Sequence, residues 1–267
     1  MKSHYCPETC RTRKMKKLLL LIFTAIVSGI SADDSFDLIY NSAQNGDVEA
    51  QCAAGICYQF GDGVPKNHVE AVKWYKKSAE AGFMDAQHLL AISLFNGQGV
   101  EKNYPEAVKW FKKAASQGYD EAMLYLAICY ESGFGVKKDN TMAFKLFCQA
   151  AETEHNYALY NVGRCWYLGI GTEKNYDQAL KYLLASAEMD NPYAQHTLGH
   201  LYAHGKGVKQ DFTVAAKYYA MAAEQNIPSA TYDLAECYAK GLGVKQDWET
   251  AFKYYLQAAI SCLLNLK

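Results

Sequence analysis

Three histidines follow one another at intervals of four residues in the C-terminal part of the chain. If this segment is helical, His196, His200 and His204 lie on one face of the helix. Two histidines spaced in this way can bind Zn²⁺ through ring nitrogens at about 2.0–2.1 Å. Asp233 and Glu236, further along the chain, could add carboxylate oxygens. The pattern is that of a candidate metal site.

Motifs that carry other chemistry are missing from the sequence. It contains no Ser-x-x-Lys, no Gly-x-Ser-x-Gly and no His-Glu-x-x-His. Gly61 to Val64 (GDGV) has the glycines of a phosphate-binding loop, but no Gly-Lys-Ser/Thr follows it. We therefore expect no catalytic residues and no cofactor.

These residues belong to a sequence that repeats itself every 36 positions. One alanine series keeps this interval over six copies: Ala50, Ala86, Ala122, Ala158, Ala194 and Ala230. Gly-x-Gly pairs and two further alanine series keep the same register, beginning at Gly61, Ala71 and Ala79. A fixed period of this length identifies a stacked repeat array.

Each unit is predicted to form two helices joined by a glycine turn. In the first copy, residues 48–60 have apolar side chains at helical spacing. Gly61 and Gly63 end that helix, because glycine adopts the left-handed conformation without a steric penalty. Asn67 is a good N-cap for the second helix. The sequence thus predicts an all-α solenoid of six 36-residue helix-turn-helix repeats over residues 47–262.

The two ends of the array depart from the unit. Residues 33–46 match only the second half of a repeat, since Ala43 lies 36 positions before Ala79. We interpret them as a capping helix that forms an N-terminal half-repeat. Residues 263–267 are assigned to a C-terminal tail.

The repeat offers a simpler account of the histidines and cysteines. His88 occupies the same repeat site as His196 without histidine companions, so the site tolerates histidine generally. This account, with no bound metal, is the one that we favour. Four cysteines share another repeat site and are expected to act as small buried apolar residues: Cys57, Cys129, Cys165 and Cys237. Cys129 and Cys148 are the pair within one unit that could form a disulfide.

The motif resembles the Sel-1-like repeat family, a relative of tetratricopeptide repeats. Its two halves stand as AQHTLGHLYAHGKGV at Ala194–Val208 and AVKWYKKSAEAG at Ala71–Gly82. The resemblance covers about residues 36–262 and implies a right-handed α-solenoid that acts as an adaptor or scaffold. Thr172 replaces the valine after the glycines, and the closing glycine is replaced in three copies, which predicts slightly altered bends at Glu154, Asp190 and Asn226.

The resemblance also implies an alternative function. One exported, cysteine-rich branch of the family is linked to β-lactam binding or hydrolysis. This chain differs from that branch, because it has no regular cysteine pair in each repeat. An exported hydrolase of the β-lactamase-like kind is therefore the alternative to a scaffold.

A partner is expected along the concave face, which first helices line in such arrays. Residues equivalent to Ala53, Ile56 and Phe60 form a stripe that varies between copies, apolar in the early copies and charged in the late ones. Such a stripe suits an extended peptide or a partner helix, while ordinary surface variation is the alternative. The stripe residues that we predict to bind a partner are Phe60, Leu89, Ile92, Tyr125, Ile128, Arg164, Leu168, His200, His204, Asp233 and Glu236.

Residues 1–32 have the order of a secretory signal peptide. The basic segment Met15–Lys17 precedes the apolar run Leu18–Val27, and small residues lead to Ala32. The run is too short to span about 30 Å of hydrocarbon, although an uncleaved anchor is the alternative. Translation from Met15 would give a normal basic start. We expect an exported protein, periplasmic or secreted.

The net charge of the chain limits the classes of partner that it can bind. The whole chain has a net charge of −1, and removal of residues 1–32 leaves 21 basic against 27 acidic residues, a net charge of −6. An acidic chain is a poor ligand for nucleic acids and anionic membranes. We expect a protein or peptide partner, no nucleic acid and no membrane span in the mature chain.

Overall fold

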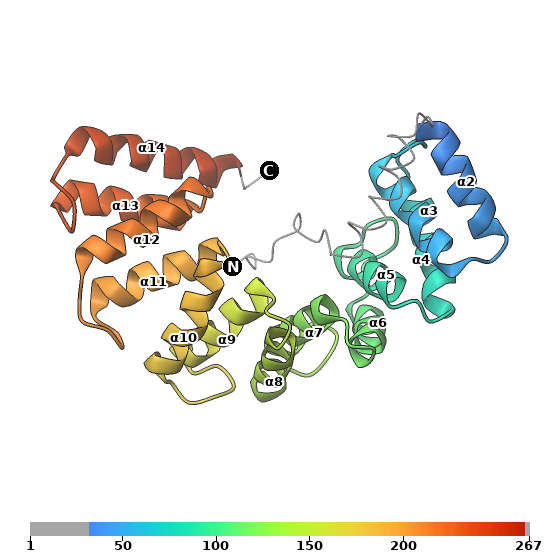
Figure 1. Cartoon of the computed structure of the whole chain (residues 1–267), viewed down its shortest axis with the longest axis horizontal. Helices are drawn as coiled ribbons and strands as arrows, with labels where there is room; N and C mark the ends of the chain where they lie inside the picture. The colour runs from blue at the N-terminus through green and yellow to red at the C-terminus, as the bar shows by residue number, and fades with distance from the viewer. Residues whose placement is uncertain (1–31, 265–267) are drawn as a thin grey trace. The chain divides into compact units, whose positions relative to one another are not determined.

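The computed structural model describes residues 32–264, and every regular element in that range is an α-helix (Figure 1). The first helices of the six repeats are α3 (Val48–Phe60), α5 (Met84–Asn96), α7 (Asp120–Ser132), α9 (Asn156–Leu168), α11 (Pro192–His204) and α13 (Pro228–Lys240). The second helices are α4 (His68–Glu80), α6 (Tyr104–Ser116), α8 (Asn140–Ala151), α10 (Tyr176–Glu188), α12 (Phe212–Glu224) and α14 (Trp248–Leu264). Equivalent helices begin 36 residues apart, which confirms the predicted repeat.

The chain divides into two compact units. Unit 1 contains the residues up to 122 together with 134–136, and unit 2 contains residues 123–133 and those from 137 onward. Within each unit, a first helix packs on its own second helix, which in turn packs on the next first helix. This order is α3, α4, α5 in unit 1 and α11, α12, α13 in unit 2. Nearest-neighbour packing of this kind is that of an α-solenoid.

The helix boundaries follow the predicted capping chemistry. The side chain of Asn67 accepts hydrogen bonds from the backbone N–H groups at the start of α4, and Asp211 does the same for α12. Gly61 ends α3 in the left-handed conformation, with φ of 85°. The second glycine has a packing role in the later pairs: a Cβ at Gly99 would overlap the backbone of His68, at the start of the second helix of the preceding repeat. The first glycine of a pair thus ends its own helix, and the second lets the second helix of the preceding repeat approach closely.

Three non-glycine residues take the place of the closing glycine. Glu154, Asp190 and Asn226 have φ of 55°, 60° and 59°, in the same left-handed region as Gly82 at 97° and Gly118 at 84°. The bend is therefore kept with somewhat smaller φ. An L-residue pays a steric cost there, which aspartate and asparagine tolerate better than glutamate.

The core is built from small and aromatic side chains at fixed repeat sites. Tyr75, Phe111 and Phe147 occupy one site in three consecutive second helices, and each is almost fully buried. The absence of a side chain at Gly55 leaves room for the Tyr75 ring, since a Cβ would overlap it. These aromatic residues fill the core at one repeat site of the second helices.

Side-chain amides fasten one repeat to the next. Gln117 at the end of α6 donates from Nε2 to Gln87 Oε1 at 2.9 Å and to the carbonyl oxygen of Gly82 at 3.1 Å. Three repeats later, Gln225 makes the same contacts with Gln195 and Asp190, at 3.0 and 3.1 Å. Because the amides of Gln87 and Gln195 are buried and need partners, each clamp fixes the register of its helices.

The ends of the array differ in what covers them. The N-terminal helix α2 (Ala32–Gln44) buries Ala43 in a cluster with Ala54 and Trp74, in keeping with a capping half-repeat. At the other end, α14 continues without a glycine or proline to Leu264, so the expected tail from residue 263 begins inside the helix. Phe252 and Leu263 on α14 are largely exposed.

Two predictions concern segments at the edge of the described range. The signal peptide expected over residues 1–32 lies outside the described residues, apart from Ala32 at the start of α2. Between residues 32 and 264, none of the helices combines the length and apolar character needed to cross a bilayer.

Candidate functional site

The first helices of unit 2 are joined to one another by side chains. Arg164 on α9 reaches back to Glu131 on α7, with Nη2 2.7 Å from Oε2. The rings of Tyr160 on α9 and Tyr193 on α11 lie 5.7 Å apart between centroids. On the next pair, His196 of α11 contacts Asp233 of α13. The four first helices of unit 2 therefore present one continuous face.

Arg164 is held in place by more than one group. Its guanidinium also donates to Asn161 Oδ1 at 3.2–3.3 Å. The side chains of Arg164 and Glu131 are only 20% and 13% exposed. Burial opposes the charge on Arg164, but the Glu131 carboxylate outweighs this and raises the pKa of the guanidinium. Arg164 thus organises the face between α7 and α9.

The predicted stripe residues differ in their access to solvent. In unit 1, Phe60 is exposed, whereas Leu89 and Ile92 are half-buried. In unit 2, Leu168 and His204 are exposed. Tyr125, Arg164, His200, Asp233 and Glu236 are half-buried. Ile128 is only 2% exposed, so its side chain belongs to the core and not to the surface of the face.

Two histidines and an aspartate converge on the face between α11 and α13. Nε2 of His196 lies 2.7 Å from Oδ2 of Asp233, and Nε2 of His200 lies 3.3 Å from the same oxygen. One ligand atom from each of the three residues falls within 4.8 Å of the others. Of the predicted metal candidates, His196 and His200 are therefore brought together with Asp233.

His204 and Glu236, which the sequence also suggested, are placed differently. The ring of His204 stacks on His200 at 6.1 Å between centroids, and its side chain is exposed. The Glu236 carboxylate accepts hydrogen bonds from Lys240 and from the Tyr255 hydroxyl, which together lower its pKa. Glu236 is thus engaged elsewhere.

Hydroxyl groups behind the histidines were not anticipated from the sequence. Tyr219 Oη lies 3.2 Å from Nδ1 of His200, and Ser229 Oγ lies 3.4 Å from Nδ1 of His196. Comparison between copies could not have singled out Tyr219, because Tyr75 and Tyr255 stand at the same repeat site. Burial, followed by the charge of His196, lowers the pKa of His200, although Asp233 opposes this.

A comparison with protein families identifies the repeat. The family model described as Sel1 repeat matches residues 48–83, 85–119, 120–153, 156–191, 192–227 and 228–260. The chain belongs to the Sel1 repeat family. The match covers all six helical hairpins of the described range and confirms the resemblance drawn from the motif.

Solved structures agree with this assignment. A Sel1 repeat protein from Oxalobacter formigenes is 32% identical with a TM-score of 0.76, over 86% of this chain and 99% of that one. A protective antigen of uropathogenic Escherichia coli is 30% identical with a TM-score of 0.77, over 84% of this chain. This Sel1 repeat chain spans about half of that antigen, 48% of its length.

A more distant structure shares the fold alone. An immunity protein from Pseudomonas aeruginosa is 20% identical with a TM-score of 0.51, over 85% of this chain and 82% of that one. The comparison with curated proteins found no matching relative.

The cysteines of these Sel1 repeats are buried thiols. At their shared repeat site, burial raises the pKa of Cys57 and Cys237 to about 11 and that of Cys129 and Cys165 to about 12. Thiols with such pKa values stay protonated at neutral pH and are poor nucleophiles. This confirms their structural role. The seven cysteines of the described range are free, and no disulfide joins Cys129 to Cys148.

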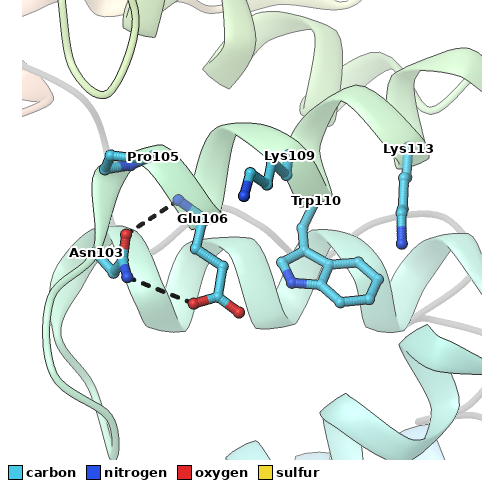
Figure 2. Close-up of a pocket in the computed structure, with 6 residues that line it drawn as sticks. All are labelled: Asn103, Pro105, Glu106, Lys109, Trp110 and Lys113. Carbon is cyan, nitrogen blue, oxygen red and sulfur yellow. Dashed lines mark hydrogen bonds between the residues drawn. The ribbon is translucent and has the colours of Figure 1, made fainter.

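A pocket of about 350 Å³ lies on the surface of α6. It is lined by Asn103, Pro105, Glu106, Lys109, Trp110 and Lys113 (Figure 2). Asn103 caps the helix by accepting from the Glu106 N–H, and Lys113 Nζ lies 3.9 Å from the centre of the Trp110 ring. The same residue types recur one repeat earlier, where Lys77 Nζ lies 4.1 Å from the Trp74 ring. Capping and shielding of the tryptophan account for these side chains.

Proposed function

We propose that this Sel1 repeat protein is an exported scaffold that binds a protein or peptide along the first-helix face of unit 2. The observation that carries the proposal is the chain of contacts through Glu131, Arg164, Tyr193, His196 and Asp233, which links four first helices into one face. The described chain consists of repeats and a cap, and arrays of this kind use such faces for binding.

The chemistry of the face suits an extended partner. Leu168 offers exposed apolar area, while His204, Asp233 and the half-buried Arg164 offer polar groups at intervals set by the repeats. A peptide or helix laid across successive first helices could meet apolar and charged groups in turn. The residues that differ from repeat to repeat lie between small core residues that all repeats share. Changes in these variable residues could therefore alter which partner is bound without altering the core.

Export is supported by the order of residues at the N-terminus. The basic Met15–Lys17, the apolar Leu18–Val27 and the small residues up to Ala32 are typical of a cleaved signal peptide. The net charge of −6 after cleavage suits a protein that stays in solution.

Site-specific photo-crosslinking tests the binding face. Benzoylphenylalanine is placed at Leu168 or His204 on the face, and at Lys181 or Lys217 on exposed positions of the second helices as matched controls. In cells that make the protein, we expect a discrete adduct from the face positions and none from the controls. Equal labelling from both sets, or none from either, overturns the proposed face.

Export and the hydrolase alternative have separate tests. Fusion of residues 1–40 to alkaline phosphatase is expected to give activity outside the cytoplasm, and deletion of Leu18–Val27 is expected to abolish it. Retention of the intact fusion in the cytoplasm overturns export. A chromogenic β-lactam assay of the mature chain tests the hydrolase, and turnover there would overturn the scaffold proposal.

A further inference from the structure

We propose that His196, His200 and Asp233 form a binding site for a divalent metal ion of the zinc class. The three side chains come from two different first helices, α11 and α13, and their ligand atoms face one another. The cluster shares His196 and Asp233 with the face that is proposed to bind a partner, but its test with a metal ion alone needs no partner.

The distances between the ligand atoms can be compared with those between two ligands of a zinc ion. Two ligands about 2.0–2.1 Å from a zinc ion, at a tetrahedral angle, lie about 3.3 Å apart. Asp233 Oδ2 is 3.3 Å from His200 Nε2 and 2.7 Å from His196 Nε2. The shorter pair, now at hydrogen-bond distance, would have to open by about 0.6 Å to seat the ion. The side chains of His196, Asp233 and His200 are 17%, 26% and 36% exposed, so an ion can enter from solvent.

The groups behind the ligands point to the same use. Metal-binding histidines usually hydrogen bond through the ring nitrogen that does not face the metal, which fixes the ring orientation. Here the Nδ1 atoms of His196 and His200 face Ser229 Oγ and Tyr219 Oη, leaving both Nε2 atoms directed at Asp233.

The donor set selects the class of ion. Two imidazoles and one carboxylate suit zinc and its neighbours in the first transition row, in contrast to the all-oxygen sites preferred by calcium and magnesium. Three protein ligands leave a position for water, as in open zinc sites.

The combination occurs in one place only along the repeats. At the sites of His200 and Asp233, the preceding pair of first helices carries Arg164 and Thr197, and the first pair carries Ile56 and Leu89. Ordinary repeat architecture therefore does not demand the cluster. The other repeats of the array fold without such a cluster.

Calorimetric titration of the full mature chain with ZnCl₂, after removal of any histidine tag, tests the proposal. We expect binding of one ion per chain. His200→Asn and Asp233→Asn are each expected to weaken binding at least tenfold. His204→Asn is the matched control on the same helix and is expected to change the affinity less than threefold. Absence of heat, or equal loss in the control, overturns the site.

A variant that removes only the Tyr219 hydroxyl tests the site with little risk of a folding defect. Tyr219→Phe introduces the residue that the same repeat site carries at 111 and 147, so the fold is expected to persist. Loss of a hydrogen bond behind a ligand typically weakens metal binding about 10–100-fold. We expect a loss in that range with unchanged helical circular dichroism. Unchanged zinc affinity in Tyr219→Phe would contradict the proposed support.

Cobalt provides a direct view of the ligands. Co²⁺ bound to two histidines and a carboxylate is expected to absorb in the visible range, and Asp233→Asn is expected to remove or shift the bands. Spectra identical to those of aqueous Co²⁺ would overturn the proposal, because they would place the ion outside the cluster.

Discussion

Nη2 of Arg164 lies 2.7 Å from Oε2 of Glu131, although 33 positions separate the two residues. The stacking of repeats turns this separation into a contact between neighbouring first helices. Because both side chains are largely buried, removal of one leaves an uncompensated charge on the other. The pair is therefore both part of the proposed binding face and part of the packing of unit 2.

Arg164→Ala is expected to destabilise the protein by about 2–3 kcal/mol, since Glu131 would keep a poorly solvated charge. In thermal unfolding followed by circular dichroism, the Tm is expected to fall by about 5–10 °C. Replacement of both residues, in Arg164→Met with Glu131→Met, is expected to recover most of the loss. A double variant as unstable as Arg164→Ala would contradict this account of the pair.

The closing residue of the third repeat offers a gain in stability. Glu154 has φ of 55°, which costs an L-residue about 1–2 kcal/mol. Glu154→Gly removes that cost but increases the freedom of the unfolded chain, so the net gain is about 0.5–1 kcal/mol. We expect the Tm to rise by about 2–3 °C. Gly82→Ala, with φ of 97° and open space around the added Cβ, is the control and should lower the Tm.

Glu121 is expected to make stability depend on pH. Burial, followed by a hydrogen bond with Asp120 and the charges of Asp120 and Asp85, raises its pKa from 4.5 to about 8. The folded state therefore holds this proton more tightly than the unfolded chain does. The corresponding stability is fully present below pH 4.5 and is lost as the pH rises through 8.

The comparison of wild type with Glu121→Gln isolates this effect. Because part of the carboxyl remains in contact with water, we expect about 1–2 kcal/mol in favour of the variant at pH 8.5, or about 3–6 °C in Tm. Below pH 4.5 the difference should be smallest. A constant difference across the whole range would show that Glu121 keeps its ordinary pKa.

The thiols should react with a disulfide reagent in an order set by burial. Cys262 is exposed and Cys148 is partly exposed, whereas the other five cysteines of the described range are buried. We expect one fast equivalent in the native mature chain, lost in Cys262→Ser, and all seven equivalents after unfolding. Recovery of only five after unfolding would indicate a disulfide in the protein.

The architecture could be predicted because its determinants are local and recur. The six alanine positions, the glycine turns and the N-caps such as Asn67 specify helices and their boundaries within each unit. The 36-residue interval then specifies which helices are neighbours. The extension of α14 to Leu264 was missed, because the tail was defined by the repeat and not by the absence of a helix breaker.

The side-chain partners at the site could be predicted only in part. Helical spacing placed His196 and His200 together, and the stacking of neighbouring repeats brought Asp233 within reach. It could not show that Lys240 and Tyr255 already hold Glu236, because this depends on side-chain directions in the next helix. The burial of Ile128 was also beyond the stripe pattern, since a helix face has no sharp edge between core and surface.

The amide clamps at Gln117 and Gln225 have a consequence for how this protein can change in length. Each clamp ties a helix to its partner and to the turn just before it, with the same partners three repeats apart. Loss or duplication of a whole 36-residue module would leave equivalent amides opposite one another. Gain or loss of a few residues inside a helix would rotate donors away from acceptors. Insertion or deletion of entire 36-residue repeats is thus the kind of length change that preserves the fold.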